Sequence, residues 1–429
     1  MEGVNAMKKK SSIMLVAIGI ACMASAVEVG NVAGRQRWPW NGLVDVDFTM
    51  SDVDSSETWY RVSVVASYSG VAGKGIRAKT FAGDSVVRGA GAHRVVWNME
   101  ADYPGVVTSN LVLSVEVAPL GDLDPVYLVI DLSAGPEASS YPLRYTFAAP
   151  DLADDTCRMT ELWLKRVPAG TFTMGSGTGS EKTIAAHSVR LTKPFYMAVF
   201  PTTQKQWERV MGDWPSYFTN ETCRAGRPVE QVSFARVRGH AGWYSGNASP
   251  GTDTFVGRLR SKSGIAGVEL PSEAQWEYVC RAGTTGEYYF NGMAVQVRNY
   301  ARTANWDGTS TDDRNQDLTK GTAKVGSYPA NPWGFYDFYG NVCQFVPDGA
   351  KQNSWKGLTF GTDLTEDPRW AFADDENVVF SGIRRGTSWR EVPGTVSSSC
   401  RRWTQFLNSD GSAHSGDSAY GFRICVNAE

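Results

Sequence analysis

Short runs in which apolar and polar residues alternate, set between clusters of glycine, constrain the first part of this chain most strongly. Such runs begin after residue 27 and continue to about residue 120. A period of two is typical of strands with one buried face, and glycine clusters are typical of the turns between strands. The alternating runs cover residues 44–50, 62–68 and 111–117, and residues 93–99 form a further short strand. They predict an immunoglobulin-like β-sandwich over residues 27–125, with no catalytic constellation of its own.

The second part of the chain follows a different pattern. Residues 126–157 interrupt the strand pattern with prolines and an acidic run, and they are predicted to form a connector. Beyond residue 158, Thr203 and Ser272 each stand three residues before a glutamine, as in the capping box that satisfies the first amides of a helix. The chain also contains 44 glycines and 15 tryptophans, which favours many turns around aromatic core anchors. The overall prediction is an α+β protein whose second domain, residues 158–429, is rich in loops.

The N-terminus is predicted to be a cleaved export signal covering residues 1–26. Three lysines precede an apolar run at 13–23, and an Ala-Ser-Ala sequence at 24–26 provides the small residues of a cleavage site. The apolar run is too short to span a bilayer, and the rest of the sequence holds no other candidate transmembrane segment. A lipoprotein signal at Cys22 is the alternative. The protein is therefore expected to be bacterial and secreted, periplasmic or attached to the cell surface.

Composition and motifs exclude several classes of function. The chain has 42 basic and 45 acidic residues, a net charge of -3, so it has no basic field for nucleic acid or an anionic membrane. Its four histidines are scattered, without the spacing of a helical metal site. No nucleophile elbow and no phosphate-binding loop is present.

Eight strings in the second part of the chain occur in an order that resembles one known family. They are VPAGTFTMGS (167–176), LTKPFYMAVFPTTQKQW (191–207), RPVEQVSF (227–234), LPSEAQWEYVCRAG (270–283), ANW (304–306), VGSYPANPWGFYDFYGNV (325–342), GTSW (386–389) and GFR (421–423). Together they resemble the formylglycine-generating enzyme family, also called the sulfatase-modifying factor family. The resemblance implies a compact mixed fold, related to C-type-lectin-like domains and often stabilised by calcium.

The family's active segment is recognisable here, but its two reactive cysteines are replaced. Residues 385–400 read RGTSWREVPGTVSSSC. In the family, a Gly-Gly-Ser-aromatic turn is followed by two cysteines, five residues apart, that hold copper. Those positions are Glu391 and Val396 in this chain. Cu(I) prefers soft thiolate ligands, whereas a carboxylate is hard and valine cannot ligate. Copper is therefore not expected, and whether the chain is an enzyme is left open.

The resemblance also implies two calcium sites, because calcium takes several oxygen ligands. The first would use Asn305, the carbonyl of Trp306, Asp317 and the carbonyl of Thr319. The second would use Asp337, the carbonyls of Gly340 and Val342, and Gln344. In the second set the family motif carries asparagine at the first position and glutamate at the last. Here Asp337 is first and Gln344 is last, so the carboxylate has moved from the last position to the first. The alternative is that these polar groups only satisfy turns.

Six cysteines remain after removal of the signal, and an even number in an exported chain favours disulfides. The resemblance implies a bridge between Cys280 and Cys400, if one residue is missing from the loop before Cys400. The pairing of the other four stays open: Cys157, Cys223, Cys343 and Cys425. Cys343 stands where the family commonly has tryptophan.

Aromatic and arginine side chains near the altered segment are candidates for a contact surface, because these residue types are enriched in binding hot spots. The candidates are Ser388, Trp389, Arg390, Trp403 and Tyr420, with Arg401 and Arg402 beside them. Core packing is the alternative for the two tryptophans, and it is the favoured one for Trp389. The predicted function is a non-catalytic module that binds a protein or glycan ligand. The alternatives are an oxidase that converts a sulfatase cysteine to formylglycine with a divergent metal site, and a cell-surface matrix component.

Overall fold

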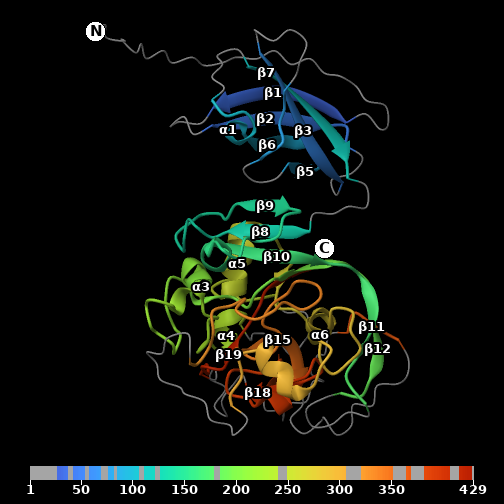
Figure 1. Cartoon of the computed structure of the whole chain (residues 1–429), viewed down its shortest axis with the longest axis vertical. Helices are drawn as coiled ribbons and strands as arrows, with labels where there is room; N and C mark the ends of the chain where they lie inside the picture. The colour runs from blue at the N-terminus through green and yellow to red at the C-terminus, as the bar shows by residue number, and fades with distance from the viewer. Residues whose placement is uncertain are drawn as a thin grey trace. The chain divides into compact units, whose positions relative to one another are not determined.

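The computed structural model divides the chain into two compact units (Figure 1). The first contains residues 1–126 and 144–147, and the second contains residues 127–143 and 148–429. The structure describes residues 27–36, 42–53, 58–68, 76–81, 85–105, 111–120, 126–177, 184–239, 249–305, 320–350, 364–368, 381–405 and 415–427. The predicted export signal, residues 1–26, lies outside the described residues.

Two antiparallel sheets form the first unit. One has the order β1 (Glu28–Gln36), β2 (Leu43–Ser51) and β6 (Gly91–Asn98). In the other, β3 (Trp59–Tyr68) pairs with β4 (Ile76–Arg77), β5 (Val86–Arg88) and β7 (Leu111–Pro119). All four strands expected from the sequence are present. Only Met99 differs, because it opens the one-turn helix α1 (Met99–Asp102).

One hydrophobic core draws on both sheets of the first unit. It includes Val46 and Phe48 of β2, Tyr60 and Val62 of β3, and Trp97 of β6. The Trp97 indole also donates a hydrogen bond of 2.8 Å to Asp102, which satisfies its polar atom inside the core. Two layers around one core are the arrangement of a sandwich. The immunoglobulin-like assignment stays a prediction.

A central antiparallel sheet organises the second unit. Its strands run in the order β14 (Val268–Glu269), β20 (Cys425–Asn427), β13 (Phe195–Ala198), β10 (Glu161–Val167) and β8 (Tyr127–Asp131). The strand near the C-terminus, β20, thus lies between two strands from much earlier in the sequence. Strands β8 and β10 and the one-turn helix α2 (Thr156–Met159) fall in or beside the segment expected as a connector. The short strand β9 (Leu143–Thr146) leads into the residues that return to the first unit.

Two smaller sheets complete the second unit. One has the order β11 (Gly170–Met174), β12 (His187–Leu191) and β16 (Thr365–Glu366). The other has the order β18 (Arg401–Gln405), β17 (Ser381–Arg385), β15 (Cys343–Ala350) and β19 (Tyr420–Gly421). The altered active segment begins at the end of β17, so this last sheet positions it.

Both helices expected from capping boxes are present. In α3 (Gln204–Met211) and α6 (Glu273–Arg281), Thr203 and Ser272 form complete capping boxes. Helix α3 ends at Gly212 and α6 ends at Ala282, and both of these residues are in the left-handed conformation. The remaining helical elements are α4 (Phe234–Val237), α5 (Phe255–Ser263), η1 (Arg224–Gly226), η3 (Ala294–Asn299) and η5 (Pro393–Thr395). Among the described residues, no helix is both long enough and apolar enough to cross a membrane.

The tryptophans of α3 and α6 are core residues, as the sequence indicated. Trp207 is fully buried and stacks on Phe255, with ring centroids 5.5 Å apart. Trp276 is also fully buried, and its indole donates to Gln344 at 2.9 Å. Helix α6 therefore contributes buried side chains, Trp276 among them, to the apolar core of this unit.

A buried ion-pair network joins α6 to that sheet. Glu273 and Glu277 of α6 are fully buried, and Arg385 at the end of β17 lies between them. Its guanidinium is 3.3 Å from Glu273 and forms a short contact with Glu277. Arg401 of β18 donates two hydrogen bonds of 2.8 Å to Glu273, and Arg281 pairs with Glu277 at 2.8 Å. Because buried charges must be paired, this network determines how the start of the altered segment sits against α6.

Candidate functional site

A left-handed glycine starts the altered segment. Gly386 follows β17 directly and has a φ of 73°, a conformation that favours glycine. A side-chain carbon at this position would also lie 2.9 Å from the carbonyl oxygen of Phe338. The next residue, Thr387, accepts a hydrogen bond of 3.1 Å from the amide of Gly340. The two glycine turns, at 340 and 386, are therefore held together before the segment reaches Ser388.

Glu391 stands at the first copper position of the family and is held by the turn that precedes it. One carboxylate oxygen, Oε2, accepts hydrogen bonds from the amide of Ser388 at 2.8 Å and from the Ser388 hydroxyl. The backbone of Glu391 is also fixed, because its carbonyl accepts from the amide of Ala304 at 3.0 Å. The carboxylate therefore has a defined position and is only partly exposed.

Cys343, the first residue of β15, is the thiol beside Glu391. Its Sγ lies 3.9 Å from Glu391 Oε1 and 3.8 Å from the carbonyl oxygen of Gly386. Burial raises the pKa of Cys343 far above its ordinary value, and the Glu391 carboxylate raises it further. Burial and the neighbouring carboxylate therefore both favour the neutral form of this thiol over the nucleophilic thiolate.

The second copper position is filled by the hydrophobic core. Val396 follows η5 and is almost completely buried, in the same core cluster as Val346 and Ile383. Its backbone amide donates to the carbonyl of Pro393 at 3.2 Å, which ties it to the turn. With a hydrogen-bonded carboxylate at one position and a packed valine at the other, the two residues present do not fit Cu(I).

Two of the five residues expected on a contact surface are buried instead. Ser388 has no exposed surface, because its hydroxyl and amide are turned inward to Glu391. Trp389 is 2% exposed, packs edge-on against Phe218 and donates from its indole to the carbonyl of Ser418 at 3.0 Å. The surface interpretation is therefore wrong for both residues, and core packing holds for Trp389.

The other three contact candidates differ from one another. Arg390 is exposed, and its guanidinium reaches Asp417 at 3.1 Å and the Ser418 hydroxyl at 2.8 Å. Tyr420 is partly buried beneath Arg384, whose guanidinium lies 3.7 Å from the centre of the tyrosine ring. Trp403 belongs to β18, but its side chain lies outside the described residues. Among the candidates whose side chains the structure describes, Arg390 is thus the exposed one.

The second predicted calcium set forms a hydrogen-bonded network of its own. The side-chain oxygen of Gln344 accepts from the Trp276 indole at 2.9 Å and from the Arg423 guanidinium at 2.6 Å. An amide oxygen has two lone pairs, so both are used. Asp337 is buried, which raises its pKa, and its Oδ2 accepts from the amide of Gly326 at 2.7 Å. Because the Arg423 guanidinium already supplies a positive charge here, the side chains of Asp337 and Gln344 do not fit calcium in this arrangement.

Most of the first calcium set lies outside the described residues. Trp306, Asp317 and Thr319 are among the residues that are not described. Asn305 is described, and its side-chain oxygen accepts a hydrogen bond of 2.9 Å from Arg298. One lone pair of that oxygen is therefore used, and calcium at this set stays a prediction.

The Cys280–Cys400 bridge implied by the resemblance is not formed in the structure. Both residues are buried and present as thiols. Burial raises the pKa of Cys280 to about 12, which keeps it protonated, and the Ser398 hydroxyl beside it acts in the opposite direction. The other four described cysteines are likewise not joined by disulfides.

Two residues next to the altered segment were missed by the sequence interpretation. Asp417 and Ser418 bind the Arg390 guanidinium, and the Asp417 carbonyl also accepts from Gln231 and Tyr420, each at 3.0 Å. No local signal marks them, because they lie almost thirty residues after Arg390 in a glycine- and serine-rich stretch. Only the folded chain brings them to the segment.

The comparisons with known proteins agree with this architecture. Residues 151–428 match the family model described as the sulfatase-modifying factor enzyme 1-like domain. The chain is 28% identical over 163 residues to the formylglycine-generating enzyme of Mus musculus, covering 38% of this chain and 40% of that protein. It is 26% identical over 298 residues to a Chlamydia pneumoniae protein named serine/threonine-protein kinase pkn1, covering 66% of this chain and 40% of that protein. It is also 28% identical over 265 residues to the chaperone protein LppX of Paenibacillus barcinonensis, covering 54% of this chain and 84% of that protein.

Solved structures that align with part of this chain include PvdO from Pseudomonas aeruginosa and CarF. PvdO aligns with 62% of this chain and 95% of its own at 23% identity and a TM-score of 0.44. CarF aligns with 62% of this chain and 97% of its own at 17% identity and a TM-score of 0.40. The family model matches more than half of the chain, and on that basis the protein belongs, through residues 151–428, to the sulfatase-modifying factor family.

Proposed function

We propose that this protein is an exported, non-catalytic member of the family whose second unit binds a protein ligand. The main support for this proposal is the chemistry of the residues at the two copper positions. Glu391 is committed to Ser388, and Val396 is packed into the core. The thiol nearby, Cys343, is fully buried, and this burial raises its pKa and favours the neutral thiol. The family's oxidation needs two thiolates, and this segment supplies neither.

An exposed apolar surface next to the altered segment supports a protein as the ligand. Met293, which immediately precedes η3, is 71% exposed, and Val295 within η3 is 61% exposed, which is unusual for large apolar side chains. Helix η3 packs beside η5, and the segment that follows it donates from Ala304 to the carbonyl of Glu391. Methionine is enriched at protein interfaces, and large apolar side chains this exposed favour a protein partner.

The names of the relatives offer a second line of support. The relative most fully covered of the three described above, at 84% of its length, is named as a chaperone protein. The chain spans only 40% of the mouse enzyme and of the kinase-named protein. A chaperone acts by binding other proteins, so this name favours a binding role. Such a role requires no reactive group at the altered segment.

The non-catalytic proposal is tested by an oxidation assay. The purified exported protein, whose first residue is expected to be Val27 after signal cleavage, is incubated with copper and a cysteine-containing sulfatase peptide. The mass of the peptide is then recorded. We expect no loss corresponding to the aldehyde and no tight copper binding. Appearance of formylglycine would refute the proposal.

The binding patch is tested by substitution. A Met293→Ser/Val295→Ser double variant is expected to weaken binding to the protein partner by about tenfold or more, because both side chains lose their apolar contact area. The matched control is Leu152→Ser, which alters another exposed apolar residue of the second unit, 38% exposed. Binding is measured by titration against the purified partner. Equal losses in the two variants would show that the patch has no specific role.

One observation favours a second candidate, an oxidase with a divergent site. The Cys343 thiol and the Glu391 carboxylate face each other at 3.9 Å, which is a thiol–acid pair at the altered position. If the oxidation assay did yield formylglycine from the peptide cysteine, molecular oxygen with the added copper would be the oxidant, and this pair would be the candidate copper ligands. Cys343→Ser would then abolish the product while leaving the melting temperature close to that of the parent protein.

We also propose calcium at the first predicted set, around Asn305. Calcium that binds only the folded protein stabilises it, so removing calcium is expected to lower the melting temperature by several degrees. The measurement is a thermal melt with a calcium-selective chelator, repeated after calcium is added back. The matched variant, Asp317→Asn, is expected to lose the response. A melting temperature that is unchanged by the chelator would remove this proposal.

A further inference from the structure

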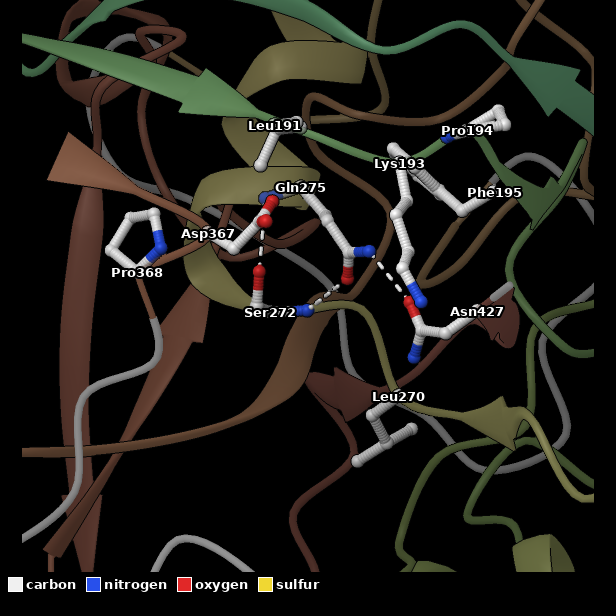
Figure 2. Close-up of a pocket in the computed structure, with 10 residues that line it drawn as sticks. All are labelled: Leu191, Lys193, Pro194, Phe195, Leu270, Ser272, Gln275, Asp367, Pro368 and Asn427. Carbon is white, nitrogen blue, oxygen red and sulfur yellow. Dashed lines mark hydrogen bonds between the residues drawn. The ribbon is translucent and has the colours of Figure 1, made fainter. Parts of the chain in front are cut away.

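A small pocket lies away from the altered segment, between the central sheet and the start of α6. Figure 2 shows its lining, and the pocket has a volume of about 190 Å³. The lining residues are Leu191, Lys193, Pro194, Phe195, Leu270, Ser272, Gln275, Asp367, Pro368 and Asn427. Five of the ten are apolar, and the polar ones come from four separate stretches of the chain. The space suits a group of the size of one amino-acid side chain.

The apolar part of the pocket is built from the rigid core. Leu191 ends β12, Phe195 begins β13, and Leu270 follows β14. All three side chains are at least 97% buried. Core packing therefore holds them in place, and they cannot rotate into the pocket and fill it. The apolar part of a ligand would therefore contact a preformed surface. No side chain of the protein would have to become ordered on binding, which would otherwise cost free energy.

The capping box of α6 orients a hydrogen-bond donor toward this pocket. Gln275 Oε1 accepts from the backbone amide of Ser272 at 2.9 Å, so its nitrogen must be the group that faces Asn427. That nitrogen donates to Asn427 Oδ1 at 2.7 Å. The Asn427 amide is therefore fixed with its oxygen toward Gln275. Its Nδ2, which can only donate, is left for another acceptor.

Lys193 places a positive charge at the same end of the pocket. Figure 2 shows its side chain extending toward Asn427, from the turn between β12 and β13. Lys193 is exposed, and it has no ion-pair or hydrogen-bond partner among the residues that the structure describes. The ammonium supplies three donors and the Asn427 amide nitrogen supplies a further one, and a carboxylate offers acceptor atoms for both groups.

The acidic residue of the pocket lies at its other end. Asp367 and Pro368 are drawn on the opposite side of the pocket from Asn427 (Figure 2). The Asp367 carboxylate accepts from the amide of Thr192 at 2.9 Å and from the Thr192 hydroxyl. Its charge is thus engaged in holding the β12–β13 turn. In Figure 2, Ser272 and Gln275 are drawn between Asp367 and Asn427, so the acidic residue and the donor groups occupy different ends of the pocket.

We propose that this pocket binds a small carboxylate whose body is apolar, with the carboxylate at Lys193 and Asn427 and the body against Leu191, Phe195 and Leu270. The site shares no lining residue with the altered segment, so it goes beyond the proposed function and does not depend on it. The chemistry defines a class, a short aliphatic or branched monocarboxylic acid, rather than one compound.

Hexanoate is a suitable probe, and hexan-1-ol is its matched neutral control. Binding to the full chain is measured by isothermal titration or by ligand-observed NMR at low ionic strength. We expect saturable binding of hexanoate, with a dissociation constant on the order of millimolar, and at least tenfold weaker binding of hexan-1-ol. Lys193→Met is expected to weaken hexanoate about tenfold or more, without a change in melting temperature, because the side chain is exposed.

Two further variants separate a site from a general charge effect. Lys320→Met removes an exposed lysine outside the pocket and is expected to leave hexanoate binding unchanged. Asp367→Asn removes the opposing negative charge and is expected to strengthen hexanoate binding. No saturable binding, equal affinity for hexanoate and hexan-1-ol, or equal losses in Lys193→Met and Lys320→Met would each overturn the proposal.

Discussion

Replacing Arg385 with methionine is expected to lower the free energy of unfolding by about 3–5 kcal/mol, the range for breaking a buried ion pair. Arg385 is fully buried and carries the charge that lies between Glu273 and Glu277. Without it, two buried carboxylates of α6 lose a shared partner, while Arg401 and Arg281 each compensate only one of them. The loss is measured by chemical denaturation followed by circular dichroism.

The matched control for Arg385 is Arg190→Met. Arg190 pairs with Glu366 at 3.2 Å, but both side chains are 54% exposed. An exposed pair contributes about 0–1 kcal/mol, since water and salt screen it. A similar small loss in the Arg385 variant would mean that the α6 carboxylates find other partners, and that this network does not hold the altered segment in place.

A double variant, Glu391→Cys/Val396→Cys, is expected to gain stoichiometric Cu(I) binding that the parent protein lacks. Thiolate is the preferred ligand for Cu(I), and the two positions are those at which the family places its copper cysteines. Valine and cysteine are similar in size, so the second substitution leaves the core around position 396 nearly filled. Copper affinity is measured by competition with a Cu(I) chelator under reducing conditions.

The two single variants are the controls for this gain. Each supplies one thiolate, and each is expected to bind Cu(I) more weakly than the double variant. Tight binding by the parent protein would contradict the prediction and would favour the divergent oxidase. Failure of the double variant to bind, with an unchanged melting temperature, would mean that the two positions are not placed to share one ion.

Local patterns in the sequence were sufficient for much of the secondary structure. The alternating runs around Phe48 and Val64 are strands β2 and β3, and the capping boxes at Thr203 and Ser272 start α3 and α6. These features depend on residues close together in the chain, so propensity and hydrogen-bonding capacity can be read directly. The order of eight strings was likewise sufficient to indicate the family.

Side-chain roles were predicted less well, because they depend on distant contacts. Gln344 was expected as a calcium ligand, but α6 and the C-terminal GFR string bring Trp276 and Arg423 to its oxygen. Ser388 was expected on a surface, but Glu391, three residues later, turns it inward. In each case the residue type was recognised, and its partner was not.

By itself, the sequence determined four strands of the first unit, the two capped helices, the family and the absence of cysteine from both copper positions, since all of these are properties of neighbouring residues or of residue identity. Only the tertiary structure decided that Val396 is core, that Cys343 meets Glu391, and that Lys193 and Asn427 share a pocket. The physical reason is that burial and pairing arise between segments up to hundreds of residues apart. These segments come into contact only when the chain packs around α6 and the central sheet.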